Sequence, residues 1–377
     1  MSPKFYDQTI RFIVWGGMNV DFFVDKTGFT GEDLLSIEHP IFAQATNNFT
    51  SGEAEAIIDR TFGNVNAKEL KYTRLRRNPR HKDRMIEPVA VIANDPERAA
   101  IWVSHKEFAL VTLIVDWWVE PLAYQGGHNL YKDGANLGMA NMLFYCLEGF
   151  WNRRFCRNFL MKFQRMIGYR ASGGFAKCEG FVQTEMKKVD DDRKEILNYF
   201  WQPFLFFDKS HIDELPKRAL DLALPGLIFL GHVWRGRFEG PWEVAHDQSS
   251  NMAKQRWLWD ALSSTDMDDA RFESPSGSQA FPMNVVRTRF AASVGEKQLQ
   301  ICDILAGLAS VYAQTLCGFS EDSDFTDNLV EAGIEKLVVG GIWPSTDVTP
   351  EELGTKGWDG NIAIDWLGKQ FRERHNS

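Results

Sequence analysis

The sequence predicts an α/β fold, a mixed β-sheet flanked by helices, with a large helical insertion and a C-terminal extension. First, apolar runs with strand-like composition lie near the N-terminus, at 20–24 and 40–46. Second, apolar and aromatic residues recur with helical spacing from 135 to 167. Third, strand signals return at 242–245 and 284–292, ahead of a long apolar helix. The predicted core is therefore built from two separated parts of the chain.

The composition is that of a folded protein of the cell interior. Of 377 residues, 44% are hydrophobic and 13% are aromatic, so there is enough apolar surface to offset the entropy lost on ordering. No apolar run approaches the ~18 residues of a membrane span, and the first residues lack the apolar region of a signal peptide. The five cysteines form no C-x-x-C pair, which argues against a zinc site or a disulfide framework. We therefore expect a cytoplasmic protein with no membrane partner.

The charge is acidic overall but unevenly distributed. The formal net charge is −9, yet residues 68–84 contain eight Lys or Arg and only two acids. Residues 151–177 contain seven basic residues and no acid. A positive surface on an acidic protein can attract a polyanion, although ordinary solvated helix faces have the same composition. Charge alone leaves both interpretations open.

The predicted elements of the N-terminal part rest on local signals. Strands at 10–15 and 20–24 flank a Gly-Gly pair that suits a hairpin turn. A third apolar run covers 40–46, and Ser51 begins a short helix with acidic residues near its start.

Two further elements complete this part. Asp95 and Pro96 suit the N-cap and first residue of a helix that reaches about residue 104. The β-branched apolar run at 108–115 is then the best candidate for a central buried strand.

Helical patterns dominate 121–239, with helices expected at 135–167, 190–199 and 212–222 and another apolar stretch from Pro225. This block is predicted to be a mostly helical insertion.

The C-terminal third returns to mixed signals. Ser293 to Glu296 fits a capping box that opens a helix reaching about Thr315. A strand at 337–343 and an amphipathic helix at 362–374 follow. The predicted organisation is a first core part at 1–120, the helical insertion at 121–239, a second core part with the apolar helix at 240–318, and a C-terminal extension at 319–377.

Four carboxylates occupy positions where strands or apolar helices seldom carry a charge. Asp25 ends an apolar strand before a glycine-containing turn, and Asp247 follows a short apolar segment. Glu69 lies beside the first basic cluster. Asp303 interrupts the apolar helix ten residues beyond Ser293, where neither capping nor the helix dipole accounts for it. A charge there is costly unless it is paired or binds a cation.

Each carboxylate also has a purely structural interpretation. Asp25 suits the start of an Asx turn, and Asp247 suits the cap of a helix that begins near Ser250. Glu69 could pair with a basic neighbour on the surface, and Asp303 could pair with an arginine of the insertion. Taken singly, none of the four identifies a site.

Taken in order, three short motifs resemble the domain-of-unknown-function 3800 family. That family has Asp-Glu-Ser-Gly at the first strand end, then His-Ala-x-Glu-Leu-Lys, then Leu-Gln-x-Ala-Asp on a helix. The corresponding residues here are Asp25, Lys26, Thr27 and Gly28, then Asn66, Ala67, Glu69, Leu70 and Lys71, then Leu299, Gln300, Cys302 and Asp303. The departures from the family pattern are Lys26, Thr27, Asn66 and Cys302. The resemblance spans roughly residues 20–120 and 240–318.

This resemblance implies a ribonuclease-H-like fold and a metal-dependent nuclease that acts on DNA or RNA. In such enzymes, carboxylates bind one or two Mg²⁺ or Mn²⁺ ions, which activate water and stabilise the leaving oxygen of a phosphodiester. The implied catalytic and metal-binding residues are Asp25, Glu69, Asp247 and Asp303, of which Asp247 is assigned by its order and context. The residues expected to bind nucleic-acid phosphates are Lys26, Lys71, Arg74, Arg76 and Arg77.

Two other functions are compatible with the sequence. The replaced motif positions suit a catalytically silent nucleic-acid-binding or scaffold protein on the same fold. A metal-dependent hydrolase of a small phosphorylated molecule, with the helical insertion as a lid, is the second.

Overall fold

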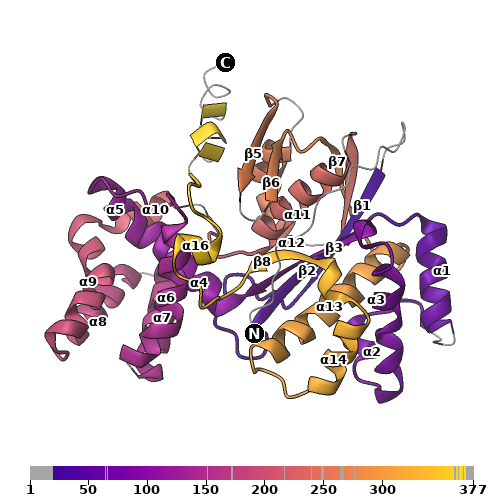
Figure 1. Ribbon diagram of the computed structural model, residues 1–377, viewed down its shortest axis with the longest axis horizontal. Helices are drawn as coiled ribbons and strands as arrows, with labels where there is room; N and C mark the ends of the chain where they lie inside the picture. The colour runs from indigo at the N-terminus through magenta and orange to yellow at the C-terminus, as the bar shows by residue number, and fades with distance from the viewer. Residues whose placement is uncertain are drawn as a thin grey trace.

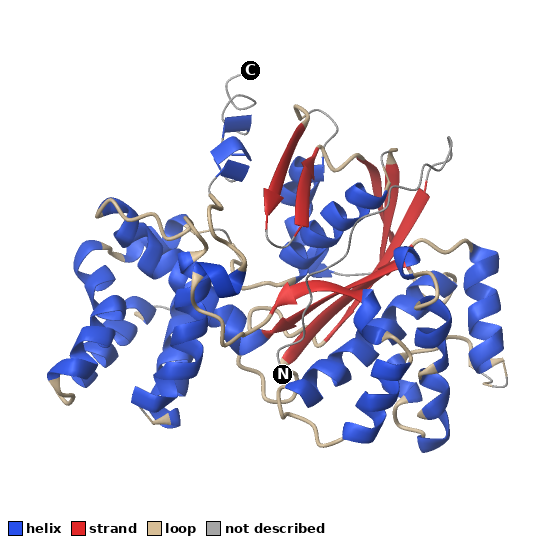
Figure 2. Ribbon diagram, in the orientation of Figure 1, coloured by secondary structure: helices blue, strands red, loops and turns tan. Residues whose placement is uncertain are grey.

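A computed structural model describes residues 20–63, 65, 67–150, 152–170, 173–215, 217–238, 240–247, 250–263, 267–274, 277–360, 362–363, 365–367 and 369–370. The strand predicted at 10–15, its Gly-Gly turn and Asn66 lie outside these described residues. Within them, a mixed six-stranded sheet is flanked by helices on both faces (Figure 1, Figure 2). The α/β class predicted from the sequence is confirmed.

The sheet has the strand order β7-β4-β1-β2-β3-β8. β1 and β3 are antiparallel to β2, which lies between them. β4 is parallel to both β1 and β7, and β8 is parallel to β3. The carboxyl ends of β1, β4 and β7 therefore meet at one edge of the sheet. The strands are β1 (Val20–Thr27), β2 (Ile41–Asn47), β3 (Ala99–His105), β4 (Trp242–Asp247), β7 (Val285–Ala291) and β8 (Val338–Ile342).

Residues of β1 alternate between two hydrophobic cores, because successive side chains of a strand point to opposite faces. Phe22 and Val24 belong to the core that extends into the helical region, whereas Phe23 belongs to the core beneath α13 (Lys297–Leu316). α13 packs on β1 and β2 and is buried along most of its length. Its length and composition would also suit a membrane span, but its burial is that of a core helix.

Several short helices accompany α13 on this face of the sheet (Figure 1). They are α1 (Ser51–Phe62), α2 (Tyr72–Leu75), α3 (Glu87–Ile92), α14 (Ser323–Glu331) and α15 (Ile334–Leu337), with single 3₁₀ turns at Pro79–His81, Asp83–Met85 and Pro96–Arg98.

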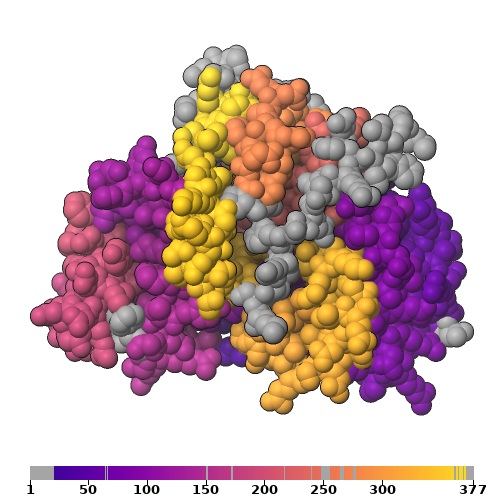
Figure 3. All heavy atoms as spheres, in the orientation of Figure 1, coloured from indigo at the N-terminus to yellow at the C-terminus, as the bar shows by residue number. Residues whose placement is uncertain are grey.

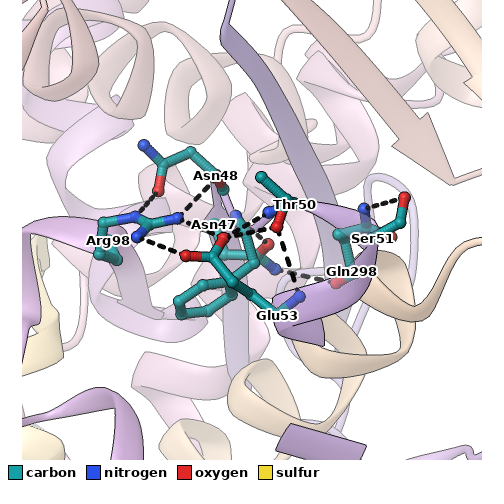
Figure 4. A network of polar contacts seen from close by, with 8 residues as sticks. Asn47, Asn48, Thr50, Ser51, Glu53, Arg98 and Gln298 are labelled. Carbon is teal, nitrogen blue, oxygen red and sulfur yellow. Dashed lines mark hydrogen bonds and ion pairs between the residues drawn. The ribbon is translucent and has the colours of Figure 1, made fainter. Parts of the chain in front are cut away.

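A polar network at the start of α1 joins three elements (Figure 4). Thr50 and Glu53 form a capping box, in which each side chain accepts a hydrogen bond from the other's backbone N–H. Arg98, at the start of β3, donates to Glu53 at 2.9 Å and to the Asn48 side chain at 2.6 Å. These bonds tie the end of β2, the start of α1 and the start of β3 together.

The other face of the sheet is covered by α11 (Ala223–Arg237), which packs on β2 and β3. Gly226 permits this close approach, since a Cβ there would lie 2.8 Å from the Trp102 ring and 2.6 Å from the Gln44 side chain. Beside α11 lie α12 (Ser250–Ser263) and a separate hairpin of β5 (Ala270–Ser274) and β6 (Gly277–Phe281).

The remaining helices form a lobe beside the sheet, at the left of Figure 1. The predicted helical character of this region is confirmed, and its apolar side chains join the core beneath α11. The pattern at 135–167 forms two helices, because Asn152 caps a second one, and the helix expected at 212–222 ends at Glu214. The lobe comprises α4 (Lys106–Ile114), a π-helix (Val115–Val119), α5 (Glu120–Gln125), α6 (Ala135–Phe150), α7 (Arg153–Ile167), α8 (Gly174–Met186), α9 (Asp191–Phe206) and α10 (Lys209–Glu214).

The C-terminal extension is part of the core. β8 adds an edge strand to the sheet, and the chain then passes between the lobe and the sheet domain (yellow in Figure 3). Asn141 of α6 donates to the backbone oxygen of Asp347 at 2.7 Å, and α16 (Pro350–Leu353) packs on α6. Of the helix predicted at 362–374, the described residues 362–363, 365–367 and 369–370 are helical.

The predicted central strand at 108–115 is wrong. This run forms α4 and the start of the π-helix, and the strand that precedes it, β3 at Ala99–His105, lies between β2 and the edge strand β8. His105 ends the strand and its Nδ1 accepts a hydrogen bond from the Phe108 N–H at 3.1 Å, which caps the helix. A fully apolar run carries no period that separates a buried strand from a buried helix.

Two predicted helix starts are also wrong. Asp95 and Pro96 precede a single 3₁₀ turn, Pro96–Arg98, and not a helix that reaches residue 104. The capping box at Ser293 does not form, since α13 begins at Lys297 with Glu296 as its N-cap. The Ser293 hydroxyl instead donates to the Glu69 carboxylate, a tertiary contact that local pattern does not reveal.

Candidate active site

Two of the predicted carboxylates lie at the ends of neighbouring parallel strands. Val24 of β1 is paired with His246 of β4, so Asp25 and Asp247 each follow the last paired position. Because side chains alternate, both residues face the α13 side of the sheet. Gly28 then turns the chain with φ +68°, where a Cβ would lie 2.1 Å from the Ile41 carbonyl oxygen. The glycine of the first motif is therefore required by the backbone conformation and the close packing at this turn.

A segment without regular structure brings Glu69 and Lys71 to the same place, and α13 holds it there. The Gln300 side chain accepts a hydrogen bond from the Leu70 N–H at 3.1 Å. The Asp303 Oδ2 accepts one from the Tyr72 N–H at 2.6 Å. Since Gln300 and Asp303 are three apart on a helix, they share a face and grip the segment on both sides of Lys71.

The Lys71 ammonium lies among three of the carboxylates. Its Nζ is 3.6 Å from Asp25 Oδ2, 3.5 Å from Glu69 Oε1 and 3.8 Å from Asp247 Oδ2. The structure therefore brings together Asp25, Glu69 and Asp247 around one cation, with Asp303 beside them through the Tyr72 backbone.

The electrostatics of this group are those of crowded, partly desolvated acids. Burial, followed by the charges of Asp247 and Asp303, raises the pKa of Asp25 to about 7. Burial also raises the pKa of Asp303, against the opposing effects of the Tyr72 N–H and Lys71. Burial lowers the pKa of Lys71, but the surrounding carboxylates outweigh it and the net shift is upward. The four acids and Lys71 thus form one electrostatic unit.

Asp303 has a structural role as well as a place in the cluster. One of its oxygens supports the N-terminus of α2, which explains a charge inside the apolar helix without an arginine partner from the insertion. Its neighbour Cys302 is buried, accepts a hydrogen bond from Asn47 at 3.0 Å and donates to the Phe23 carbonyl at 3.2 Å. Cys302 therefore anchors α13 to the sheet.

The predicted phosphate-binding residues other than Lys71 lie in two places. Lys26 alternates with Asp25, so it points to the other face of β1, and its Nζ lies 5.2 Å from the centre of the Phe29 ring. Burial lowers its pKa against the attraction of Asp25, Asp221 and Asp247. Its side chain therefore leaves β1 on the face opposite to that of Asp25.

The arginines lie elsewhere. Arg74, Arg76 and Arg77 are exposed on and just after α2, on the chain that leaves Lys71.

Sequence reasoning gave no role in the site to three residues that build it. Ser293 binds Glu69, Gln300 holds the segment, and Gly307 leaves room for the Tyr72 ring, whose Cγ would lie 2.1 Å from a Cβ at residue 307. Gln300 is part of the third motif and Gly307 follows Asp303 by one helical turn. The helical spacing of 300, 303 and 307 indicates Gln300 and Gly307, whereas no local signal joins Ser293 to Glu69.

A divalent ion is chemically compatible with this donor set, but the carboxylates around Lys71 are not in the closer arrangement that a shared metal ion needs. Among the residues that the structure describes, no three Asp, Glu, His or Cys side chains are already close enough to share one metal ion. The distances of 3.5–3.8 Å to the Lys71 Nζ exceed the ~2.1 Å of a Mg²⁺–oxygen bond. Asp25 Oδ2 is, however, a buried oxygen with no hydrogen-bond partner, and carboxylate oxygens are the donors that Mg²⁺ and Mn²⁺ prefer.

Comparison with known proteins adds no relative. No protein-family model, no curated protein and no solved structure matches this chain. The resemblance to the domain-of-unknown-function 3800 family stays a prediction that rests on the three motifs.

Proposed function

We propose that this protein is a metal-dependent nuclease that hydrolyses phosphodiester bonds of DNA or RNA in the cytoplasm. The observation that carries the proposal is that Asp25, Glu69 and Asp247 converge on the Lys71 ammonium. Asp303 lies beside them, bound to the Tyr72 N–H. Carboxylates that repel one another at a sheet edge favour a cation between them, and phosphodiester hydrolysis is a common use of such a site.

The order of the strands supports the same proposal. Five strands follow the order β3-β2-β1-β4-β7, with β2 antiparallel to its neighbours and β4 and β7 parallel to β1. Asp25 and Asp247 therefore lie at the ends of neighbouring parallel strands, and both are close to the Lys71 ammonium. This supports the proposal, because the implied ribonuclease-H-like nucleases bind metal with acids from two strand ends and neighbouring helices.

The residues of the cluster have distinct parts in the proposed reaction. Asp25, Glu69, Asp247 and Asp303 would hold one or two Mg²⁺ or Mn²⁺ ions, which supply an activated water and charge stabilisation for the leaving oxygen. Lys71 would bind a non-bridging phosphate oxygen, and Arg74, Arg76 and Arg77 would position the backbone of the nucleic acid.

A nuclease assay tests the proposal directly. Single- and double-stranded DNA and RNA and a DNA–RNA hybrid are incubated with the protein in Mg²⁺, Mn²⁺ or EDTA. We expect metal-dependent cleavage that is at least about 100-fold slower in Asp25→Asn, because one charge of the cluster is lost. Asp59→Asn makes the same chemical change on an exposed position of α1 and is expected to leave the rate unaltered. Absence of metal-dependent cleavage of every substrate by the wild type contradicts the proposal.

One observation favours a second candidate, the catalytically silent nucleic-acid-binding protein. Lys71 already compensates part of the carboxylate charge from within the chain. In a silent protein this ion-pair network would be purely structural, and divalent ions would not raise the melting temperature. A nuclease site would bind the ion in the native state, so the melting temperature would rise with Mn²⁺ in the wild type and rise less in Asp303→Asn.

A further inference from the structure

The backbone on both sides of Lys71 is fixed to α13. The Leu70 N–H is bound by Gln300, the Tyr72 N–H is bound by Asp303, and Gly307 receives the Tyr72 ring. Lys71 itself has extended backbone angles, φ −126° and ψ 132°. Its Cα is thus held in place, and the flexible four-carbon stem of the side chain is the part that can move.

The Lys71 ammonium contacts the carboxylates and is also partly open to solvent. It lies among the three carboxylates, yet 22% of its side chain is exposed. It is a strongly hydrated point charge, and its distances of 3.5–3.8 Å to the oxygens are too long for tight hydrogen bonds. The buried Asp25 Oδ2, 3.6 Å away, has no hydrogen-bond partner. The ammonium therefore offsets the charge of Asp25 but does not form a hydrogen bond with its Oδ2.

We infer that Lys71 is an exchangeable internal counter-cation. It neutralises the carboxylate cluster when no divalent ion is bound. When a divalent ion binds, the Lys71 ammonium leaves the cluster and becomes available to a substrate phosphate. This inference rests on the proposed nuclease function. It makes Lys71 a competitor of the divalent ion, and it couples metal binding to nucleic-acid binding, because the same exchange frees a cation for the phosphate.

Metal binding without any nucleic acid tests the exchange. Mn²⁺ is titrated by calorimetry into the full chain of the wild type, Lys71→Met and Lys68→Met. We expect Lys71→Met to bind Mn²⁺ at least about tenfold more tightly, because the competing charge is gone and the carboxylates repel one another more strongly. Lys68→Met makes the same change on an exposed lysine three residues earlier and is expected to match the wild type.

The outcomes separate this inference from the proposed function. Wild-type binding of Mn²⁺ with equal or weaker binding by Lys71→Met overturns the exchange and leaves the nuclease proposal standing. Failure of both proteins to bind Mn²⁺ overturns the proposed function, and the exchange with it.

A measurement on the wild type covers the case in which Lys71→Met does not fold. Reductive methylation of lysines is followed by mass spectrometry with and without Mn²⁺. Lys71 is expected to react several-fold faster with Mn²⁺, since its amine has left the cluster, whereas Lys68 keeps its rate. An unchanged or slower reaction of Lys71 in a protein that binds Mn²⁺ overturns the inference.

Discussion

At the scale of single residues, Gly307 sets how closely α13 approaches the segment that carries Lys71. A Cβ at this position would lie 2.1–2.6 Å from three atoms of the Tyr72 ring, and that ring is buried. The Tyr72 N–H is in turn the donor to Asp303. The absence of a side chain at Gly307 therefore lets α13 hold the residue that directly follows Lys71.

We expect Gly307→Ala to lower the free energy of unfolding by about 1–3 kcal/mol, because the added methyl forces the Tyr72 ring out of its place. Gly180→Ala is the matched control, since Gly180 lies in α8 with no atom within 4 Å of an added Cβ. That change is expected to stabilise the protein by about 0.5–1 kcal/mol through helix propensity. Urea unfolding of both variants checks the opposite signs, and equal effects would contradict the packing argument.

Asp116 is a carboxylate that is largely buried inside the helical lobe. It lies in the π-helix, and Asn136 donates to its Oδ1 at 3.2 Å. Burial raises the pKa of Asp116 to about 6, and the Asn136 bond opposes the shift. The Asn136 Oδ1 is buried without a hydrogen-bond partner, so a protonated Asp116 could supply the missing donor.

This raised pKa predicts a pH dependence of stability. The native state binds the Asp116 proton more tightly than the unfolded state does, so the free energy of unfolding falls as the pH rises from about 4 to about 6 and then levels off. Asp116→Asn should remove this loss and be more stable than the wild type by about 1–3 kcal/mol at pH 7, with little difference at pH 4. Urea unfolding across this pH range measures it, and a difference independent of pH would contradict it.

At the scale of elements, caps decide where helices begin, and a strand can end in a cap. His105 closes β3 and caps α4, so the apolar run that follows becomes a helix. Thr50 similarly separates β2 from α1. In both cases the start of the helix is set by one side chain that accepts a hydrogen bond from the backbone N–H three residues later.

Removing the cap of α1 should cost stability without moving the carboxylate cluster. We expect Thr50→Ala to lower the free energy of unfolding by about 1 kcal/mol, because the Glu53 N–H loses its acceptor, and Thr50→Ser to retain most of it. Chemical denaturation of the three proteins compares them. The same midpoint for Thr50→Ala and the wild type would show that Arg98 and Glu53 hold the start of α1 without the cap.

At the scale of the whole molecule, an acidic protein exposes arginines on the chain that follows Lys71. Arg74 lies on α2 and Arg77 in the turn that follows it; both are exposed, and the Arg77 N–H is bonded to the Arg74 carbonyl at 3.3 Å. Exposed arginines of this kind suit contact with a phosphate backbone rather than with bases.

Replacing Arg74 and Arg77 together with Ala should weaken binding of many sequences alike and reduce the salt dependence of the binding constant by up to about two in log–log slope. Fluorescence anisotropy with labelled DNA and RNA at several salt concentrations measures this slope. The control replaces the exposed Arg154 and Arg165 of α7. If only the α7 variant loses affinity, the nucleic acid follows the lobe instead of α2.

The sequence by itself determined the α/β class, the helical lobe and most strands of the sheet. Apolar runs bounded by turns identified β2 and β7, and the Thr50 region carried a complete local start signal for α1. These features depend on neighbours within a few residues, so periodicity and capping chemistry suffice to predict them. Three short sequence motifs also contain Asp25, Glu69 and Asp303 and predict them as site residues.

Only the tertiary structure decided what surrounds those acids. The place of Lys71 depends on hydrogen bonds that Gln300 and Asp303 accept from the neighbouring backbone N–H groups, across separations of 230 and 231 residues in the chain. The segment 108–115 forms a helix directly after β3, and its apolar side chains pack into the core shared with the helical lobe, which a local apolar run does not reveal. Contacts between distant residues are set by packing of the whole chain. For that reason the sequence could name the charged residues of the site, and the fold alone placed an ammonium among them.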